Sequence, residues 1–110
     1  MTDRELLELA AKAYGAAQYP ETGEWEYFFE RDPDDDGEFK EWNPLADDGD
    51  ALRLAVQLHL SVCVEFDQTW IASHGYPTTP VCFENHGTDP DAASRRAIVR
   101  AAAEIGKAMK

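Results

Sequence analysis

The stretch WNPLADDGDALRLAVQLHL, residues 42–60, decides how this chain is organised. Pro44 lacks a backbone donor and disfavours helix at Asn43, so we expect an extended segment to end at this corner. Asp47 or Asp48 can then cap a helix with an acidic first turn. The apolar positions of this helix cover more than half of its circumference, which predicts contacts with a sheet and with another element. These positions are Ala51, Leu52, Leu54, Ala55, Val56 and Leu58.

The same stretch separates two halves of very different charge. Residues 1–50 hold 16 acids and 4 bases, whereas residues 51–110 hold 6 of each, so the net charge of −12 lies entirely before residue 51. Like charges repel phosphate. We therefore expect no direct binding to nucleic acid or to an anionic membrane. The charge permits a protein partner with a basic surface, a bound cation, or solubility alone.

Helical spacing predicts two more helices, one near each end of the chain. The first covers residues 3–14, with Thr2 as its cap and Gly15 at its end. The last covers about residues 89–108 and begins at Asp89 and Pro90. Its expected buried stripe consists of Ala93, Ala97, Ile98, Ala101, Ala102, Ile105 and Met109.

Alternating patterns predict the strands. An acidic hairpin is expected from residues 24–30 and 38–42, and a three-strand meander from residues 61–66, 69–73 and 81–84. The fold class that follows is α+β, with a small antiparallel sheet (the meander plus the acidic hairpin) and helices packed on both faces, an α-β-α sandwich. We expect one domain over residues 1–110.

Cellular location and redox state are also indicated. No apolar run approaches the roughly 20 residues that span a bilayer, and the N-terminus does not have the pattern of a secretory signal, so a cytoplasmic protein is expected. Cys63 and Cys82 both fall in strand-like runs. We expect two buried free thiols, with a cross-strand disulfide as the alternative.

The candidate partner-binding site is the acidic hairpin. Phe28 alternates with acids along the first strand and is either an exposed anchor for a partner or part of a second small apolar cluster. The carboxylates form a solvated negative face or, at the regular spacing of a strand, imitate a phosphate ladder. The candidate residues are Glu24, Glu26, Phe28, Glu30, Asp34, Asp35, Asp36, Glu38 and Glu41.

A calcium site is a further hypothesis for the same hairpin. Asp32, Asp34, Asp36 and Glu38, with Gly37 among them, match the first half of a calcium-binding loop. The match fails at Asn43, where a bidentate Glu is expected, and a solvated hairpin tip explains the acids better. No other cofactor is expected.

No set of residues indicates catalysis. Cys63, His74, Cys82 and His86 lack the close pairs of a zinc site, and Cys82 with His86 lacks a nucleophile motif. We therefore expect a non-enzymatic protein.

The last helix carries a small basic patch made of Arg95, Arg96 and Arg100. This patch could bind the acidic hairpin of another copy, so a homodimer is an alternative.

Two segments carry a resemblance to a known family. EWNPLADDGDALRLAVQL, residues 41–58, and DPDAASRRAIVRAAAEIGKAM, residues 89–109, resemble small proteins of tailed phages and prophages that have the phage α-β-α sandwich domain. The likeness covers roughly residues 1–14 and 41–110 and leaves the acidic hairpin outside. This family is one of unknown function and offers no catalytic residues to transfer.

The resemblance implies a sandwich fold, a phage or prophage origin and a place of action in the bacterial host cytoplasm. From it we expect an accessory protein whose acidic first half binds a host protein. The alternative is a DNA mimic that inhibits a host defence complex or another nucleic-acid-binding complex.

Overall fold

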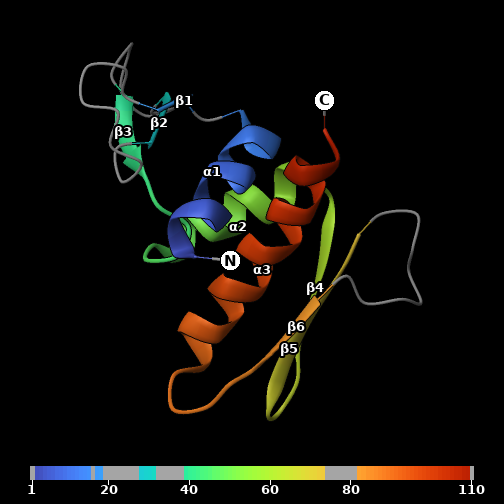
Figure 1. The fold of residues 1–110 in the computed structure, drawn as a ribbon. Coiled ribbons are helices and arrows are strands. Elements are labelled where there is room, and N and C mark those ends of the chain that lie inside the picture. Colours follow the sequence, from blue (N-terminus) through green and yellow to red (C-terminus); the bar gives the residue numbers. More distant parts are fainter. Residues whose placement is uncertain (1, 16, 19–27, 32–38, 74–81, 110) are drawn as a thin grey trace.

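The computed structural model describes residues 2–15, 17–18, 28–31, 39–73 and 82–109 (Figure 1). The described strands form two antiparallel sheets with strand orders β1-β2-β3 and β4-β5-β6. The elements in chain order are α1 (Asp3–Tyr14), β1 (Ala17–Gln18), β2 (Phe28–Arg31), β3 (Phe39–Trp42), α2 (Asp48–Gln57), β4 (Leu60–Val64), β5 (Gln68–Ser73), β6 (Cys82–Asn85) and α3 (Pro90–Ala108).

The helices begin where the capping signals predict. The side chain of Thr2 accepts a hydrogen bond from the Glu5 amide at 3.2 Å, which satisfies one of the free amides in the first turn of α1. The carboxylates of Asp47 and Asp89 do the same at α2 and α3, at 2.8 and 3.0 Å. Gly15 ends α1 in the left-handed conformation, with φ of 93°, which glycine adopts without steric cost.

The second sheet is the expected meander. Its strands pair in a register that places Val62, Ile71 and Cys82 side by side across β4, β5 and β6. Ile71 and Cys82 are buried, and the Cys82 thiol donates to the carbonyl oxygen of Ala97 on α3 at 3.0 Å. The α+β class, with helices packed against a three-strand antiparallel sheet, is confirmed.

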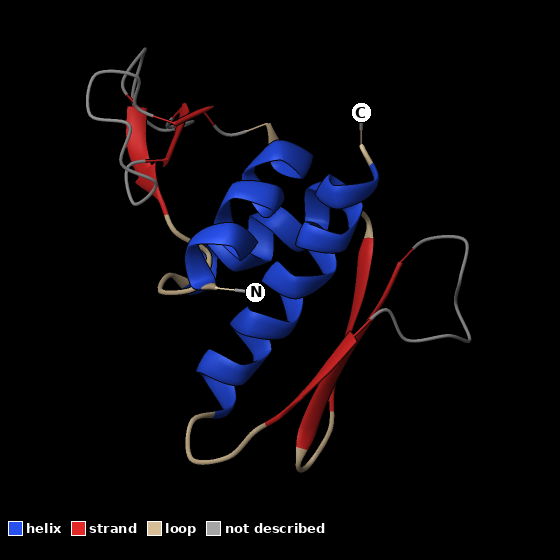
Figure 2. Cartoon of the chain, viewed as in Figure 1, coloured by secondary structure: helices blue, strands red, loops and turns tan. Residues whose placement is uncertain are grey.

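The placement of the helices differs from the expected one. All three described helices lie on the same side of the β4-β5-β6 sheet, and α3 runs along it (Figure 2). α1 packs against α3 instead of against the opposite face of the sheet. The physical reason is that α3 is apolar on two sides, so it accommodates the sheet on one and α1 on the other.

The burial of α3 shows this double contact. Val99 and Ala103, which lie outside the expected stripe, are buried, whereas Met109, which was expected inside it, is exposed. At Gly106 the two helices approach so closely that a Cβ atom would collide with the backbone carbonyl of Leu9 on α1. Glycine is therefore the residue that this crossing requires.

α2 is less buried than its wide apolar stripe predicts. Ala51, Leu54 and Ala55 are buried in the core, but Leu52 and Val56 are exposed.

In the described ranges, no helix has the combination of length and apolar content that crossing a membrane requires.

Candidate functional site

The candidate site is the acidic hairpin, and the structure describes part of it. β2 and β3 pair antiparallel, as expected, and β1 joins them on the other side of β2. Glu30 lies opposite Lys40, and Phe29 lies opposite Glu41. A two-residue strand such as β1 carries no periodic signal, which is why the sequence did not reveal it.

The register also defines the two faces of the hairpin. Phe28 lies opposite Trp42, and directly opposed positions of an antiparallel pair share one face. The Trp42 side chain is almost completely buried. The hairpin therefore joins the core at the Trp42 end of β3.

The remaining candidate residues lie outside the described part of the chain. They are Glu24, Glu26, Asp34, Asp35, Asp36 and Glu38, together with Asp32 of the calcium hypothesis. Among the residues that are described, no group of three or more His, Cys, Asp and Glu side chains is placed to hold a metal ion.

Trp42 anchors the hairpin to the helices. Its ring stacks on that of Tyr14, at the end of α1, with a centroid distance of 5.1 Å and an interplanar angle of 15°. Such a pair stabilises by more than its buried area alone. The end of β3 is thus fixed against α1.

The Asn-Pro corner fixes the direction in which β3 leaves the core. The Asn43 amide donates to a carboxylate oxygen of the buried Asp50 at 2.9 Å, and the Leu45 amide donates to the Asn43 side chain at 3.2 Å. Arg53 pairs with the other carboxylate oxygen of Asp50. A buried carboxylate with two such partners is well satisfied, and it ties the corner to α2.

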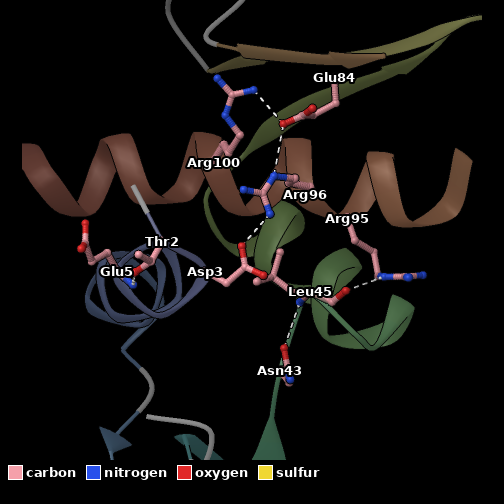
Figure 3. Close-up of polar contacts among 9 residues, drawn as sticks. All are labelled: Thr2, Asp3, Glu5, Asn43, Leu45, Glu84, Arg95, Arg96 and Arg100. Atoms are coloured by element: carbon pink, nitrogen blue, oxygen red, sulfur yellow. Dashed lines mark hydrogen bonds and ion pairs between the residues drawn. The ribbon is translucent and has the colours of Figure 1, made fainter. Parts of the chain in front are cut away.

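Arg95 holds the same corner from α3. Its Nε donates to the Leu45 carbonyl oxygen at 2.9 Å (Figure 3). Its Nη1 pairs with Asp48 at 2.6 Å. The side chain of Arg95 is mostly buried.

The other two arginines of α3 are also paired within the chain. Arg96 lies between Asp3 and Glu84, at 2.7 and 3.5 Å, and Arg100 reaches Glu84 at 2.8 Å (Figure 3). The sequence predicted a basic patch of three arginines on this helix. In the structure these arginines pair with acids of the same chain and join α3 to α1, to β6 and to the corner. Self-association through these arginines and the acidic hairpin of another copy stays a prediction.

The two cysteines are free. They lie on β4 and β6, which are separated by β5, so a cross-strand disulfide is excluded by the strand order. Burial raises the pKa of the Cys82 thiol to about 11, which keeps it protonated near neutral pH. A protonated thiol is a poor nucleophile, and this argues against the nucleophile alternative.

A polar network that the sequence did not indicate lies between β5 and α3. The hydroxyl of the buried Thr69 hydrogen-bonds to His86 Nε2 at 2.8 Å and to the Ser94 hydroxyl at 2.7 Å. The three side chains come from β5, from the connection between β6 and α3, and from α3, so no local motif could reveal them. The network satisfies buried polar atoms and links the start of α3 to the sheet.

Comparison of the chain with protein-family models, with curated proteins and with solved structures gave no match.

Proposed function

We propose that this chain is a non-enzymatic accessory protein whose acidic first half binds a basic surface of another protein. The observation that carries this proposal is the pairing of its arginines. In the described part of the chain, five arginines pair with acids outside the hairpin: Arg4, Arg53, Arg95, Arg96 and Arg100. These positive charges are already engaged elsewhere, whereas residues 21–41 contain ten acids and two bases.

The attachment of the hairpin supports the same proposal. Trp42 and the Asn43–Asp50 contact hold the end of β3 against the helices. A charged element that is fixed before binding loses less conformational entropy when it meets a partner. Its negative field also accelerates encounter with a basic surface, in a manner that salt weakens.

The nature of the partner rests on the family resemblance. The resemblance implies a place of action in the bacterial host cytoplasm, and a host protein with a basic surface would fit both the charge and that implied origin. The residues proposed to make the contact are the hairpin acids with Phe28.

Affinity capture with matched charge variants tests the proposal. Immobilised wild-type protein is exposed to a bacterial lysate and eluted with increasing salt, beside a hairpin variant with Glu24→Gln, Glu26→Gln, Glu30→Gln and Glu41→Gln. A control variant loses the same charge at exposed positions elsewhere, through Glu5→Gln, Glu8→Gln, Glu65→Gln and Glu104→Gln. We expect capture to survive in the control and to fail in the hairpin variant. Equal capture by the two variants would contradict the proposal.

The DNA-mimic alternative has a separate readout. If the captured protein binds DNA, duplex DNA and this chain should compete for it, and the hairpin variant should no longer displace DNA from it.

Calcium titration by calorimetry addresses the metal hypothesis, because binding through the 32–38 loop should release or absorb heat and raise the melting temperature.

A further inference from the structure

β4 forms an edge of its sheet. In the described part of the chain it pairs with β5 alone, and the Glu65 amide extends this ladder by donating to the Gln68 carbonyl oxygen at 2.8 Å. Hydrogen-bonded pairs alternate along an antiparallel ladder, so residues 61, 63 and 65 turn their backbone groups towards β5. Leu60, Val62 and Val64 therefore turn theirs away from the sheet, where a further strand could pair with them.

Two valines of β4 lie on the side of the sheet that carries the helices, yet no described helix covers them. Val62 lies opposite the buried Ile71, and Val64 lies opposite Thr69. Thr69 hydrogen-bonds to Ser94 of α3, and directly opposed residues share one face. Both valines therefore face the side on which α3 lies. They are 39% and 62% exposed, so α3 leaves this edge of the face open.

A groove of about 170 Å³ lies beside Val62, between α2, β4 and α3. Its apolar lining includes Leu52 of α2 and Ile98 of α3, and Leu52 is 63% exposed. A strand added beside β4 would direct every second side chain to the face of Val62. The groove is therefore placed to receive an aliphatic side chain of such a strand.

The accessible charge at the rim of this groove is negative. Asp48 and Asp91, in the first turns of α2 and α3, line the groove, and both are exposed. Asp91 pairs with no cation of the described residues. The one cation in the lining, Arg95, is mostly buried and already donates to the Leu45 carbonyl oxygen and to Asp48. A basic side chain of a partner thus finds an unmatched carboxylate at Asp91.

Asp91 lies towards the Val64 end of β4. Ser94, about one helical turn further along α3, hydrogen-bonds to Thr69 at 2.7 Å, and Thr69 pairs with Val64. In an added strand, the residue that faces Val64 stands two positions from the one that faces Val62, on the same face. A lysine or arginine there is attracted by the Asp91 carboxylate, whereas a glutamate is repelled.

We propose that β4 and this groove bind an extended segment of another protein in which an aliphatic residue and a lysine or arginine stand two positions apart. The segment adds a fourth strand to the sheet, with its backbone paired to residues 60, 62 and 64. Its aliphatic side chain enters the groove beside Leu52 and Ile98, and its cation meets Asp91.

Charge selects such a segment over a second copy of this chain. The β4 sequence LSVCV contains no cation, so a second β4 paired at this edge would leave the Asp91 carboxylate unmatched. Two copies of net charge −12 also repel each other. The proposed surface contains no residue of the acidic hairpin, so it is a second binding surface beside the one proposed above.

A synthetic peptide tests the proposal on the full chain. The probe is Thr-Lys-Thr-Ile-Thr-Lys-Thr, which places the isoleucine and both lysines on one face of a strand in either orientation. NMR titration of labelled protein should give saturable shifts at the amides of residues 60, 62 and 64. The methyl groups of Leu52, Val62 and Ile98 should shift with them, and added salt should weaken the binding.

Two matched peptides separate the proposed contacts from general attraction to an acidic chain. The peptide with glutamate in place of both lysines should bind more than about tenfold more weakly. The isomer Thr-Lys-Ile-Thr-Thr-Lys-Thr has the same charge but places isoleucine on the face opposite the lysines, and it should lose affinity to a similar extent.

Protein variants test the groove and its rim. Val62→Lys fills the groove with a long side chain and offers its own ammonium group to the rim, so it should abolish the shifts at β4. The matched control is Phe83→Lys on β6, the opposite edge strand, where the side chain is also exposed. It should leave binding unchanged. Asp91→Asn should reduce the preference for the lysine peptide over the glutamate peptide, whereas Glu104→Gln, further along α3, should retain it.

Four results would overturn the proposal. They are equal affinity for the lysine and glutamate peptides, shifts confined to residues outside β4 and the groove, unchanged binding by Val62→Lys, and self-association of the wild type that Val62→Lys removes. The last result would assign the edge to a second copy. The hairpin variant of the capture experiment should bind the probe as the wild type does, so failure here and failure of the proposed function are distinguishable.

Discussion

The side chain of Arg95 on α3 donates to the backbone carbonyl oxygen of Leu45, 50 residues earlier in the chain, at 2.9 Å. Leu45 follows the Asn-Pro corner, so this bond ties the last helix to the turn between β3 and α2. Asp48, in the first turn of α2, pairs with the same guanidinium. One side chain thus fixes the corner at two points.

Replacing Arg95 tests how much this contact contributes. Arg95→Met keeps the apolar stem but leaves a partly buried carbonyl oxygen without its donor, and we expect the free energy of unfolding to fall by about 1–3 kcal/mol. Arg95→Lys should recover only part of this, because an ammonium cannot make the forked contact. Urea denaturation measures the change. Arg4→Met, which removes an exposed pair with Glu8, should cost less than about 1 kcal/mol.

Gly106 sets the distance between α1 and α3. In an isolated helix, alanine would be favoured over glycine by about 1 kcal/mol. Here its Cβ would collide with the Leu9 carbonyl, and rigid backbone cannot move aside cheaply. We therefore expect Gly106→Ala to lower the free energy of unfolding by about 1–3 kcal/mol, as measured by thermal and urea denaturation. Lys107→Ala, one residue along on the exposed side, should be neutral, and a stabilised Gly106→Ala variant would refute the close crossing.

Thr69 connects His86 to Ser94 in the buried network. Thr69→Val has nearly the same shape but removes the hydroxyl, so both partners lose a hydrogen bond in a buried setting. We expect a loss of about 1–3 kcal/mol in the free energy of unfolding. Thr69→Ser keeps the hydroxyl and should lose less. Similar losses in the two variants would show that packing of the methyl group, and not the network, stabilises this site.

The elements that the sequence predicts well are those with local signals. Thr2, Asp47 and Asp89 mark helix starts through side-chain caps, and the capping bonds are present. The alternation in residues 61–66 identifies a strand in the same way. These signals arise from groups within a few residues of one another, so the linear pattern contains them.

The arrangement of elements depends on contacts that the pattern does not contain. The exposure of Leu52 and Val56 could not be foreseen, because an apolar stripe indicates burial without naming the neighbour that provides it. The arginines of α3 look like a free patch in the sequence, yet Arg96 finds its partners at Asp3 and Glu84. Such pairs form only once the helices have packed.

The candidate site was inferred from charge, and its acids between positions 31 and 39 lie outside the described residues.

Cys82 gives the fold a pH dependence at the alkaline end. Burial raises the pKa of its thiol from 9.0 to about 11, while the nearby Arg100 guanidinium opposes this shift. Well below pH 9 the thiol is protonated in both the folded and the unfolded chain, so it does not affect the pH dependence of stability there. Between pH 9 and pH 11 the unfolded chain loses the proton while the folded chain retains it, and the folded state is therefore progressively destabilised.

We expect Cys82 to remove about 2–3 kcal/mol from the free energy of unfolding as pH rises through this interval. Other groups titrate there too, so the measurement is the difference in slope between wild type and Cys82→Ala, from urea denaturation at a series of pH values. The variant lacks the thiol and should lose less stability per pH unit, whatever its stability at neutral pH. Parallel slopes for wild type and Cys82→Ala would show that the Cys82 thiol is not shielded from water as the structure indicates.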